Sequence, residues 1–138
     1  MSDCIFCKIV EGSIPSSIVF EDDTVYSFLD INPASKGHFL VIPKKHVEDI
    51  SELGDTEITA IFSAIRKLTK ALPDVLGNTG FNILMNYGKD AGQIISHLHF
   101  HIIPRKKEDG LGIAGWNHLK FSGDHLNEIA KEIAEAIK

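Results

Sequence analysis

The sequence contains few cysteines and no long hydrophobic run. Cys4 and Cys7 are the two cysteines among 138 residues, which excludes a disulfide-dense miniprotein. No apolar run approaches the roughly 20 residues that a bilayer-spanning helix needs, and the first four residues do not begin a signal peptide. We therefore expect a cytoplasmic protein with no membrane partner.

A surplus of positive charge is also missing. The sequence has 14 Lys and Arg against 19 Asp and Glu, so its net charge is 14 − 19 = −5. A protein that binds nucleic acid by neutralising phosphates has the opposite balance, so we expect no nucleic-acid partner. Apolar residues make up 43% and charged residues 24%, as in globular domains. Without repeats or linkers, residues 1–138 are expected to form a single domain.

The pattern of apolar residues predicts several strands and two helices. A hairpin is expected at 18–21 and 25–29, and further strands at 38–42, 80–86 and 94–104. A helix capped by Asp55 is expected to end at Pro73, and a second apolar stripe with helical spacing spans 126–137. Because strands and helices do not alternate as βαβ units, the prediction is an α+β fold with an antiparallel sheet.

Three histidines alternate with apolar residues in the last expected strand. Along a strand, His97, His99 and His101 would share one face. The outer two would stand about 13 Å apart, too far to share one metal ion with bonds of about 2 Å. A row of imidazoles about 7 Å apart suits a phosphoryl ester or polyphosphate better, with one ring attacking and another contacting the charge. The alternative is a polar face with incidental histidines.

The loop before this strand contains two glycines, Gly88 and Gly92. Glycine lets backbone amides approach an anion closely, but a tight turn between two strands would use the same residues. The loop alone therefore does not decide between anion binding and a turn.

The sequence resembles the histidine triad (HIT) family, in its nucleotide-binding, Hint-like branch. The signature His-x-His-x-His followed by two apolar residues is matched by 97–103, and similar segments extend the resemblance over about 4–105, leaving 106–138 as a C-terminal extension and helix. Those segments are 5–9, 28–33, 37–46, Asn86 and 91–93. The resemblance implies a homodimer whose two central sheets join into one.

The resemblance also implies a role for each matching residue. His99 would be the nucleophile that attacks the α-phosphorus and forms a nucleotidyl-histidine intermediate. His101 would contact the phosphate oxygens, and His38 would line the same pocket. Asp30 would bind the ribose, with Ile31 beside it. The phosphate and leaving group would be held by Asn86, Gly92, Gln93 and the backbone of Ile94. The purine base would be flanked by Phe6, Ile9, Phe28 and Ile31.

The proposed chemistry makes two demands on the histidines. The attacking ring must be neutral, so we expect a backbone carbonyl to orient His99 through its other nitrogen. A cationic His101 is expected to stabilise charge on the phosphoryl oxygens, and this step needs no metal. Many Hint-like members have Ser or Thr after the Gly-Gln pair, whereas Ile94 lacks a hydroxyl that could assist leaving-group protonation.

Cys4 and Cys7 form a Cys-x-x-Cys pair with three possible roles. Redox chemistry, free thiols and zinc binding all fit the pair itself. In the zinc-bearing proteins that this chain resembles, the two further ligands come from the positions of His46 and His97. Two Cys and two His would make a closed, structural site. The resemblance also implies that Trp116 and the residues after it reach the partner's active site.

The first function hypothesis is a homodimeric hydrolase or transferase that releases a nucleoside monophosphate from purine nucleoside 5′-phosphoryl compounds such as phosphoramidates. Hydrolysis of dinucleoside polyphosphates by the same mechanism is an alternative. A nucleotide-binding module with vestigial catalysis and a metal-dependent hydrolase are alternatives from other classes. Relative turnover of a phosphoramidate and a dinucleoside polyphosphate separates the first two hypotheses. Binding of AMP without turnover would select the binding module, and loss of turnover on chelation in folded protein would select the metal-dependent hydrolase.

Overall fold

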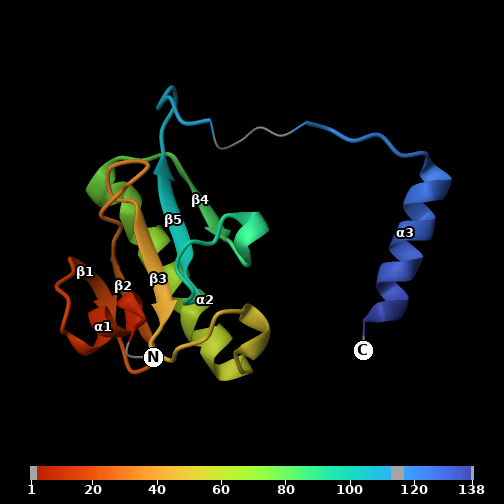
Figure 1. Cartoon of the computed structure of the whole chain (residues 1–138). Helices are drawn as coiled ribbons and strands as arrows, with labels where there is room; N and C mark the ends of the chain where they lie inside the picture. The colour runs from red at the N-terminus through yellow and green to blue at the C-terminus, as the bar shows by residue number, and fades with distance from the viewer. Residues whose placement is uncertain (1–2, 113–116, 138) are drawn as a thin grey trace.

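The computed structural model describes residues 3–112 and 117–137, so the expectation for Trp116 lies outside the described residues. Five antiparallel strands form one sheet in the order β1-β2-β3-β5-β4 (Figure 1). The strands are β1 (Ile18–Glu21), β2 (Val25–Leu29), β3 (Phe39–Pro43), β4 (Gly80–Met85) and β5 (Phe100–Arg105). The helices are α1 (Ile5–Glu11), α2 (Asp55–Leu76) and α3 (Gly123–Ala136), with short 3-10 helices at Ile50–Glu52 and Lys89–Ala91. The predicted α+β fold is confirmed.

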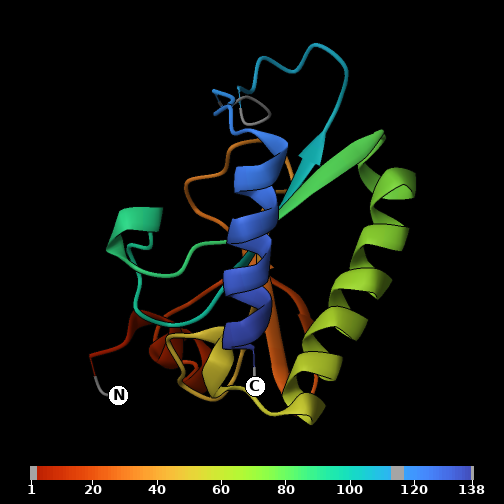
Figure 2. The same ribbon diagram turned by 90° about the vertical axis from the view of Figure 1, so that its right-hand side faces the viewer.

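The helix α2 covers one face of the sheet, and α1 lies against the other (Figure 2). Below α2, apolar side chains of β2, β3 and β5 form the larger core, which includes Val25, Phe39 and Ile102. The side chains at the intervening positions of β2 and β3 point to the opposite face and form a second core with α1, which includes Tyr26, Phe28 and Leu40. Since successive side chains of a strand point to opposite faces, the β-branched and aromatic runs supply both cores.

The bounds predicted for α2 need two corrections. Gly54, rather than Asp55, occupies the N-cap position, and the Glu57 carboxylate accepts a hydrogen bond from its N–H. The helix also continues through Pro73 to Leu76. Proline removes a single backbone donor, and the extra turn ends in the favourable left-handed cap of Gly77, whose φ is 68°.

The predicted strand 94–104 is wrong in its first half. The strand β5 begins at Phe100, and the backbone bends over residues 95–97. The Leu98 N–H donates to the Val47 carbonyl at 2.7 Å, so this segment pairs with the loop after β3 rather than continuing the sheet. The sequence alternation misled the prediction because Leu98, which precedes the strand, is buried in the same core as the apolar residues of β5.

The two ends of the chain also differ in how well the sequence predicted them. Helix α1 was not predicted, because seven residues are too few to display a helical period. The helix α3 confirms the stripe at 126–137 and begins at the cap Ser122. No helix in the described part of the chain is long and apolar enough to span a membrane.

Candidate functional site

The candidate active site lies on the α1 face, where three strands bring His38, His101 and Asp30 together. Asp30 follows β2, His38 precedes β3, and His101 lies in β5 opposite Leu40. The ring of His101 lies 5.2 Å from that of His38 and 5.0 Å from that of His99, measured between centroids. Residues separated by more than 60 positions therefore form one cluster of side chains.

His99 has one ring nitrogen fixed by the backbone. Its Nδ1 lies 2.7 Å from the carbonyl oxygen of His97, so Nδ1 carries the proton and donates to that oxygen. The ring is 6% exposed, and Phe6 packs edge-on against it with centroids 5.2 Å apart. The expected orientation by a backbone carbonyl is confirmed, and it leaves the Nε2 lone pair unprotonated.

A directed chain of hydrogen bonds fixes the other two rings. The Ala34 N–H donates to His38 Nδ1 at 2.9 Å, so the proton of a neutral His38 lies on Nε2. His38 Nε2 is 3.0 Å from His101 Nδ1 and can donate to it. The remaining proton of a neutral His101 then lies on Nε2. Sequence reasoning missed the Ala34 amide, because a backbone donor has no residue signature.

The expectation of a cationic His101 is wrong. Burial, reinforced by the neighbouring His99 and His38, lowers the pKa of His101 to about 4, although Asp30 acts in the opposite direction. Burial also lowers the pKa of His38. Both rings are therefore neutral near pH 7. His101 offers an N–H donor by virtue of its tautomer rather than its charge.

Asp30 is positioned by its own turn. Its Oδ1 accepts a hydrogen bond from the Asn32 N–H at 2.8 Å. Its Oδ2 lies 3.5 Å from His38 Nε2 and 4.0 Å from His101 Nδ1. One carboxylate and two imidazoles could in principle hold a metal ion. The tautomer disfavours this, because the Ala34 N–H occupies the nitrogen of His38 that would have to be protonated if Nε2 bound a metal.

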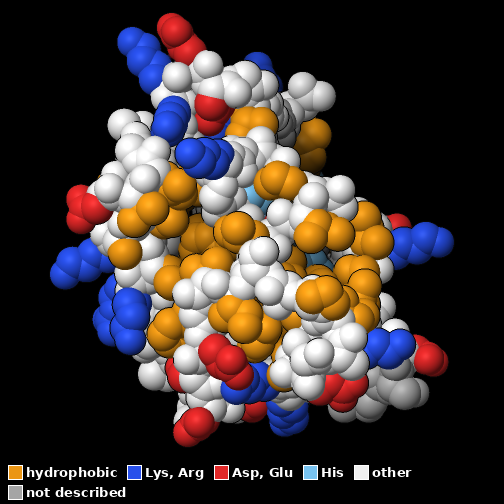
Figure 3. Space-filling view, turned by 90° about the vertical axis from the view of Figure 1, so that its left-hand side faces the viewer, with side chains coloured by type: hydrophobic (Ala, Val, Ile, Leu, Met, Phe, Trp, Pro, Cys, Tyr) orange, Lys and Arg blue, Asp and Glu red, His pale blue; other side chains and the backbone are white. Residues whose placement is uncertain are grey.

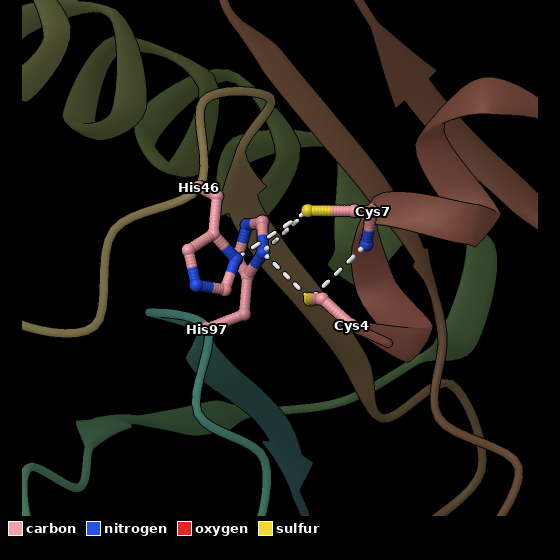
Figure 4. Close-up of side chains that lie close together, drawn as sticks. All are labelled: Cys4, Cys7, His46 and His97. Carbon is pink, nitrogen blue, oxygen red and sulfur yellow. Dashed lines mark hydrogen bonds between the residues drawn. The ribbon is translucent and has the colours of Figure 1, made fainter. Parts of the chain in front are cut away.

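A second cluster unites Cys4, Cys7, His46 and His97 (Figure 4). Their ligand atoms all lie within 4.8 Å of one another. Cys4 Sγ is 3.3 Å and Cys7 Sγ 3.6 Å from His97 Nδ1, and Cys7 Sγ is 3.4 Å from His46 Nδ1. Zinc bonds of about 2.0–2.3 Å in a tetrahedron place ligand atoms roughly 3.3–3.8 Å apart. The separations in the cluster therefore fit such an ion.

The tautomer of His97 also fits a metal. Its Nε2 lies 2.8 Å from the Pro43 carbonyl oxygen and donates to it, which leaves the Nδ1 lone pair directed at the two sulfurs. Burial and the adjacent Cys4 thiol raise the pKa of the Cys7 thiol to about 11. A redox nucleophile needs a thiolate at rest, which this raised pKa disfavours, whereas a bound metal ion would itself stabilise the thiolate.

The loop between β4 and His97 is built around Gly88 and Gly92, whose φ values are 87° and 90°. The side chain of Gln93 braces this loop: its oxygen accepts from the Gly88 N–H and its amide donates to the Ile95 carbonyl. A Cβ at Gly92 would lie 3.9 Å from Asn86 Nδ2, so Asn86 borders the loop. Both ends of the Gln93 amide are used here, and the backbone N–H groups of Gly92 and Gln93 also donate within the loop, to the Lys89 and Gly88 carbonyls. These donors, which were expected at the phosphate, are therefore occupied by the loop itself.

The residues expected at the base fall into two groups. Phe6, Ile9 and Phe28 are buried in the core below α1, whereas Ile31 is 92% exposed. Ile94 is 89% exposed and lines a cavity of about 390 Å³ beside Cys4 and His46. Figure 3 shows hydrophobic side chains over a broad, hollowed part of one face, with histidine atoms visible between them.

Comparisons with known proteins agree with this arrangement. The HIT domain family matches residues 11–108. An uncharacterised HIT-like protein of Methanocaldococcus jannaschii is 46% identical over 94% of this chain and 98% of its own. The adenosine 5′-monophosphoramidase hnt1 of Schizosaccharomyces pombe is 43% identical over 98% of both chains. The chain therefore belongs to the HIT family.

Solved structures support the same assignment. A HIT family protein from Bacillus subtilis, 42% identical, superposes with a TM-score of 0.92 over 99% of this chain and 98% of its own. A zinc-bound histidine triad protein from Mycobacterium smegmatis, 31% identical, has a TM-score of 0.76 over 99% of both chains.

Proposed function

We propose that this protein is a nucleotide hydrolase or transferase that acts on purine nucleoside 5′-phosphoryl compounds and releases the nucleoside monophosphate through His99. The observation that carries the proposal is the His99 ring, with Nδ1 fixed on the His97 carbonyl at 2.7 Å and Nε2 left as a free lone pair. The 43% identical adenosine 5′-monophosphoramidase of S. pombe supports an AMP-X substrate, in which X is the leaving group.

His99 Nε2 attacks the α-phosphorus, and the bond between phosphorus and the leaving group breaks with its electron pair. The leaving group takes a proton from the surrounding water, and the nucleotide remains bound to His99. Water then attacks the same phosphorus and releases a proton to the solvent, the electron pair of the nitrogen–phosphorus bond returns to His99 Nε2, and the monophosphate leaves. Covalent catalysis of this kind divides one hard displacement into two easier steps. The imidazole lone pair is itself the nucleophile, so this step needs no metal.

His101 and His38 stabilise the phosphoryl group in this mechanism. The Ala34 N–H holds His38, and His38 holds His101, so that the His101 Nε2–H is directed away from the chain of rings. A fixed donor of this kind stabilises charge that grows on a phosphoryl oxygen. This series of hydrogen bonds begins at the backbone amide of Ala34, which does not give up its proton. His101 therefore acts as a hydrogen-bond donor and not as a proton source. Asp30 binds the ribose beside Ile31, and the Gly92–Ile94 backbone and Asn86 border the phosphate.

We assign a structural zinc ion to Cys4, Cys7, His46 and His97. Four protein ligands would leave no open position, so the ion would cross-link α1 to the loops after β3 and before β5. The zinc-bound relative from M. smegmatis supports this assignment.

We further propose a homodimer in which the two sheets join through β4. The strand β4 is one edge of the sheet, and its side chains Phe81 and Ile83 are 38% and 43% exposed. The opposite edge, β1, has four residues and an irregular register between Ile18 and Phe20. Short, irregular edges resist pairing, whereas a regular edge with apolar side chains favours it.

The test of the proposed function is AMP release from adenosine 5′-phosphoramidate by the wild type and His99→Ala, with and without a chelator. We expect His99→Ala to lose at least roughly 1,000-fold in kcat and still bind AMP, because the nucleophile is removed. Chelation is expected to leave the chemical step intact in folded protein. Release by a folded His99→Ala at the wild-type rate would overturn the assignment.

The same experiment with a dinucleoside polyphosphate distinguishes the substrate classes. Faster turnover of that compound would assign the protein to polyphosphate hydrolysis by the same histidine. Binding of AMP without turnover of either substrate would identify a binding module.

A further inference from the structure

The ring of Phe6 packs against two histidines of the segment before β5. Its centroid is 5.2 Å from that of His99 and 5.9 Å from that of His97, with interplanar angles of 88° and 70°. Aromatic rings favour such edge-to-face arrangements. The hydrogen bond that orients the His99 ring joins the same two residues, from His99 Nδ1 to the His97 carbonyl. One side chain therefore contacts both partners of the bond that sets the His99 tautomer.

Phe6 is itself held by two elements. It belongs to α1, whose first turn is capped by a hydrogen bond from the Cys7 N–H to Cys4 Sγ at 3.3 Å. Phe28 of β2 packs against it with centroids 5.4 Å apart, and Phe6 is 7% exposed. Three aromatic neighbours at this exposure leave little of the Phe6 ring for a purine base, which is the contact that the family resemblance implied.

A single hydrogen bond does not fix an imidazole ring in every direction. It restrains one ring nitrogen, whereas rotation about the Cβ–Cγ bond of histidine has broad energy minima. Rotation of the His99 ring would break the bond from Nδ1 and let the proton occupy Nε2, which removes the lone pair required for attack. The contacts of His99 with Phe6 and with His101, whose centroid is 5.0 Å away, restrict this rotation.

We propose that Phe6 is a positioning residue for the nucleophile: its ring keeps the His99 imidazole in the orientation in which Nδ1 holds the proton and the Nε2 lone pair is free to attack. Phe6 acts through His99 and touches no reacting atom. Because a small misplacement of reacting groups lowers the rate by orders of magnitude, the contact affects the chemical step rather than nucleotide binding. This inference rests on the proposed function of His99, and it gives Phe6 a role other than contact with the base.

The kinetics of Phe6→Leu separate this role from contact with the base. Leucine keeps most of the apolar volume but has no aromatic edge, so we expect kcat on adenosine 5′-phosphoramidate to fall at least roughly tenfold. The Kd of AMP should stay within about threefold of the wild-type value, because the nucleotide does not touch this ring. A contact with the base predicts the reverse, a weaker affinity for AMP at an unchanged kcat, and that result would overturn the proposal.

Val10→Ala is the matched control for lost packing. Val10 also lies in α1 and packs against the core that contains Phe6, so its truncation should lower the Tm much as Phe6→Leu does. Its kcat should nevertheless stay within about twofold of the wild type, because the His99 ring keeps its contact with Phe6. An equal fall of kcat in both folded variants would show a general effect of α1 packing and contradict a specific role of the Phe6 ring.

Nitrogen-15 NMR of the imidazole rings measures the tautomer directly and needs no turnover. At about pH 8, where a histidine ring is ordinarily neutral, His99 of the wild type and of Val10→Ala should hold its proton on Nδ1. Phe6→Leu should show a second population with the proton on Nε2, with the His99 signals assigned by their loss in His99→Ala. Identical tautomers in the wild type and Phe6→Leu would overturn the proposal. A wild type that turns over no substrate would refute the proposed function instead, and the tautomers would still decide the role of Phe6.

Discussion

Backbone groups decide which nitrogen of each site histidine carries the proton. The carbonyl of His97 fixes His99, the amide of Ala34 fixes His38, and the carbonyl of Pro43 fixes His97. In the proposed mechanism, identical side chains thereby obtain different chemistry: a nucleophile, a donor relay and a metal ligand. His97 would act twice, since its ring faces the cysteines and its carbonyl orients the His99 ring.

The donor relay can be tested at His38. A glutamine amide can still donate to His101 Nδ1, whereas a leucine of similar size cannot. We expect His38→Leu to lose roughly 100-fold in kcat, and His38→Gln to stay within about tenfold of the wild type, because loss of one fixed donor at a phosphoryl oxygen has an effect of that size. The measurement is kcat and KM on adenosine 5′-phosphoramidate. Equal losses in both folded variants would show that the relay does not act through donation.

The lowered pKa of His101 makes the stability of the fold depend on pH. The unfolded chain protonates this ring near pH 6.5, but the folded chain does so only near pH 4. The free energy of unfolding therefore includes the full contribution of the neutral His101 ring above pH 6.5. This contribution is lost as the pH falls from 6.5 toward 4, because the unfolded chain binds the proton first. With the ring partly exposed, we expect a loss on the order of 2 kcal/mol.

Urea unfolding between pH 7 and pH 4.5 measures this effect. The free energy of unfolding of the wild type should fall more steeply with acid than that of His101→Gln, which lacks the titrating ring. Parallel curves for the two proteins would refute the assignment, since carboxylates titrate equally in both.

At the scale of the elements, the short helix α1 depends on a contact that backbone hydrogen bonds do not supply. It has seven residues and buries only Phe6 and Ile9. The proposed zinc ion would fix its N-terminal end through Cys4 and Cys7. Removal of zinc by a chelator should lower the Tm of the wild type by several degrees, because metal binding contributes to folding.

Cys4→Ser is the control for this element. Its Tm should already be low and should not respond to the chelator, because one sulfur ligand is missing. Hydrogen exchange should locate the difference in α1. Metal analysis that finds no zinc in wild-type protein grown with zinc would contradict the assignment.

The sequence predicted the elements whose pattern is long and regular. The hairpin β1–β2, the body of α2 and α3 all follow from alternation or from a 3.6-residue period. Short or bent segments were missed: α1 is brief, and the bend before Phe100 depends on hydrogen bonds to Val47 and Pro43, more than 50 residues away. The family motifs named the candidate residues that the structure brings together in two clusters, but the tautomers and the charge of His101 depend on burial and on backbone groups.

On the scale of the whole molecule, the two edges of the sheet differ in length and regularity. The edge β1 is short and irregular, whereas β4 pairs with β5 over six consecutive residues and leaves its other edge free within the described chain. The proposed joining of sheets lies on the β4 side, and β4 neighbours β5, which holds His101. The partner would therefore be bound one strand away from His101.

The last prediction compares these two edges. Ile83→Lys places a charge on β4, where the side chain is 43% exposed, and Ile18→Lys places the same charge on β1, where it is 58% exposed. Lysine on an edge strand blocks pairing with another sheet, so we expect Ile83→Lys to be monomeric at concentrations at which the wild type and Ile18→Lys are dimers. Light scattering during size exclusion measures the mass of each. If Ile18→Lys dissociates and Ile83→Lys does not, the sheets join through β1 and the proposed interface is wrong.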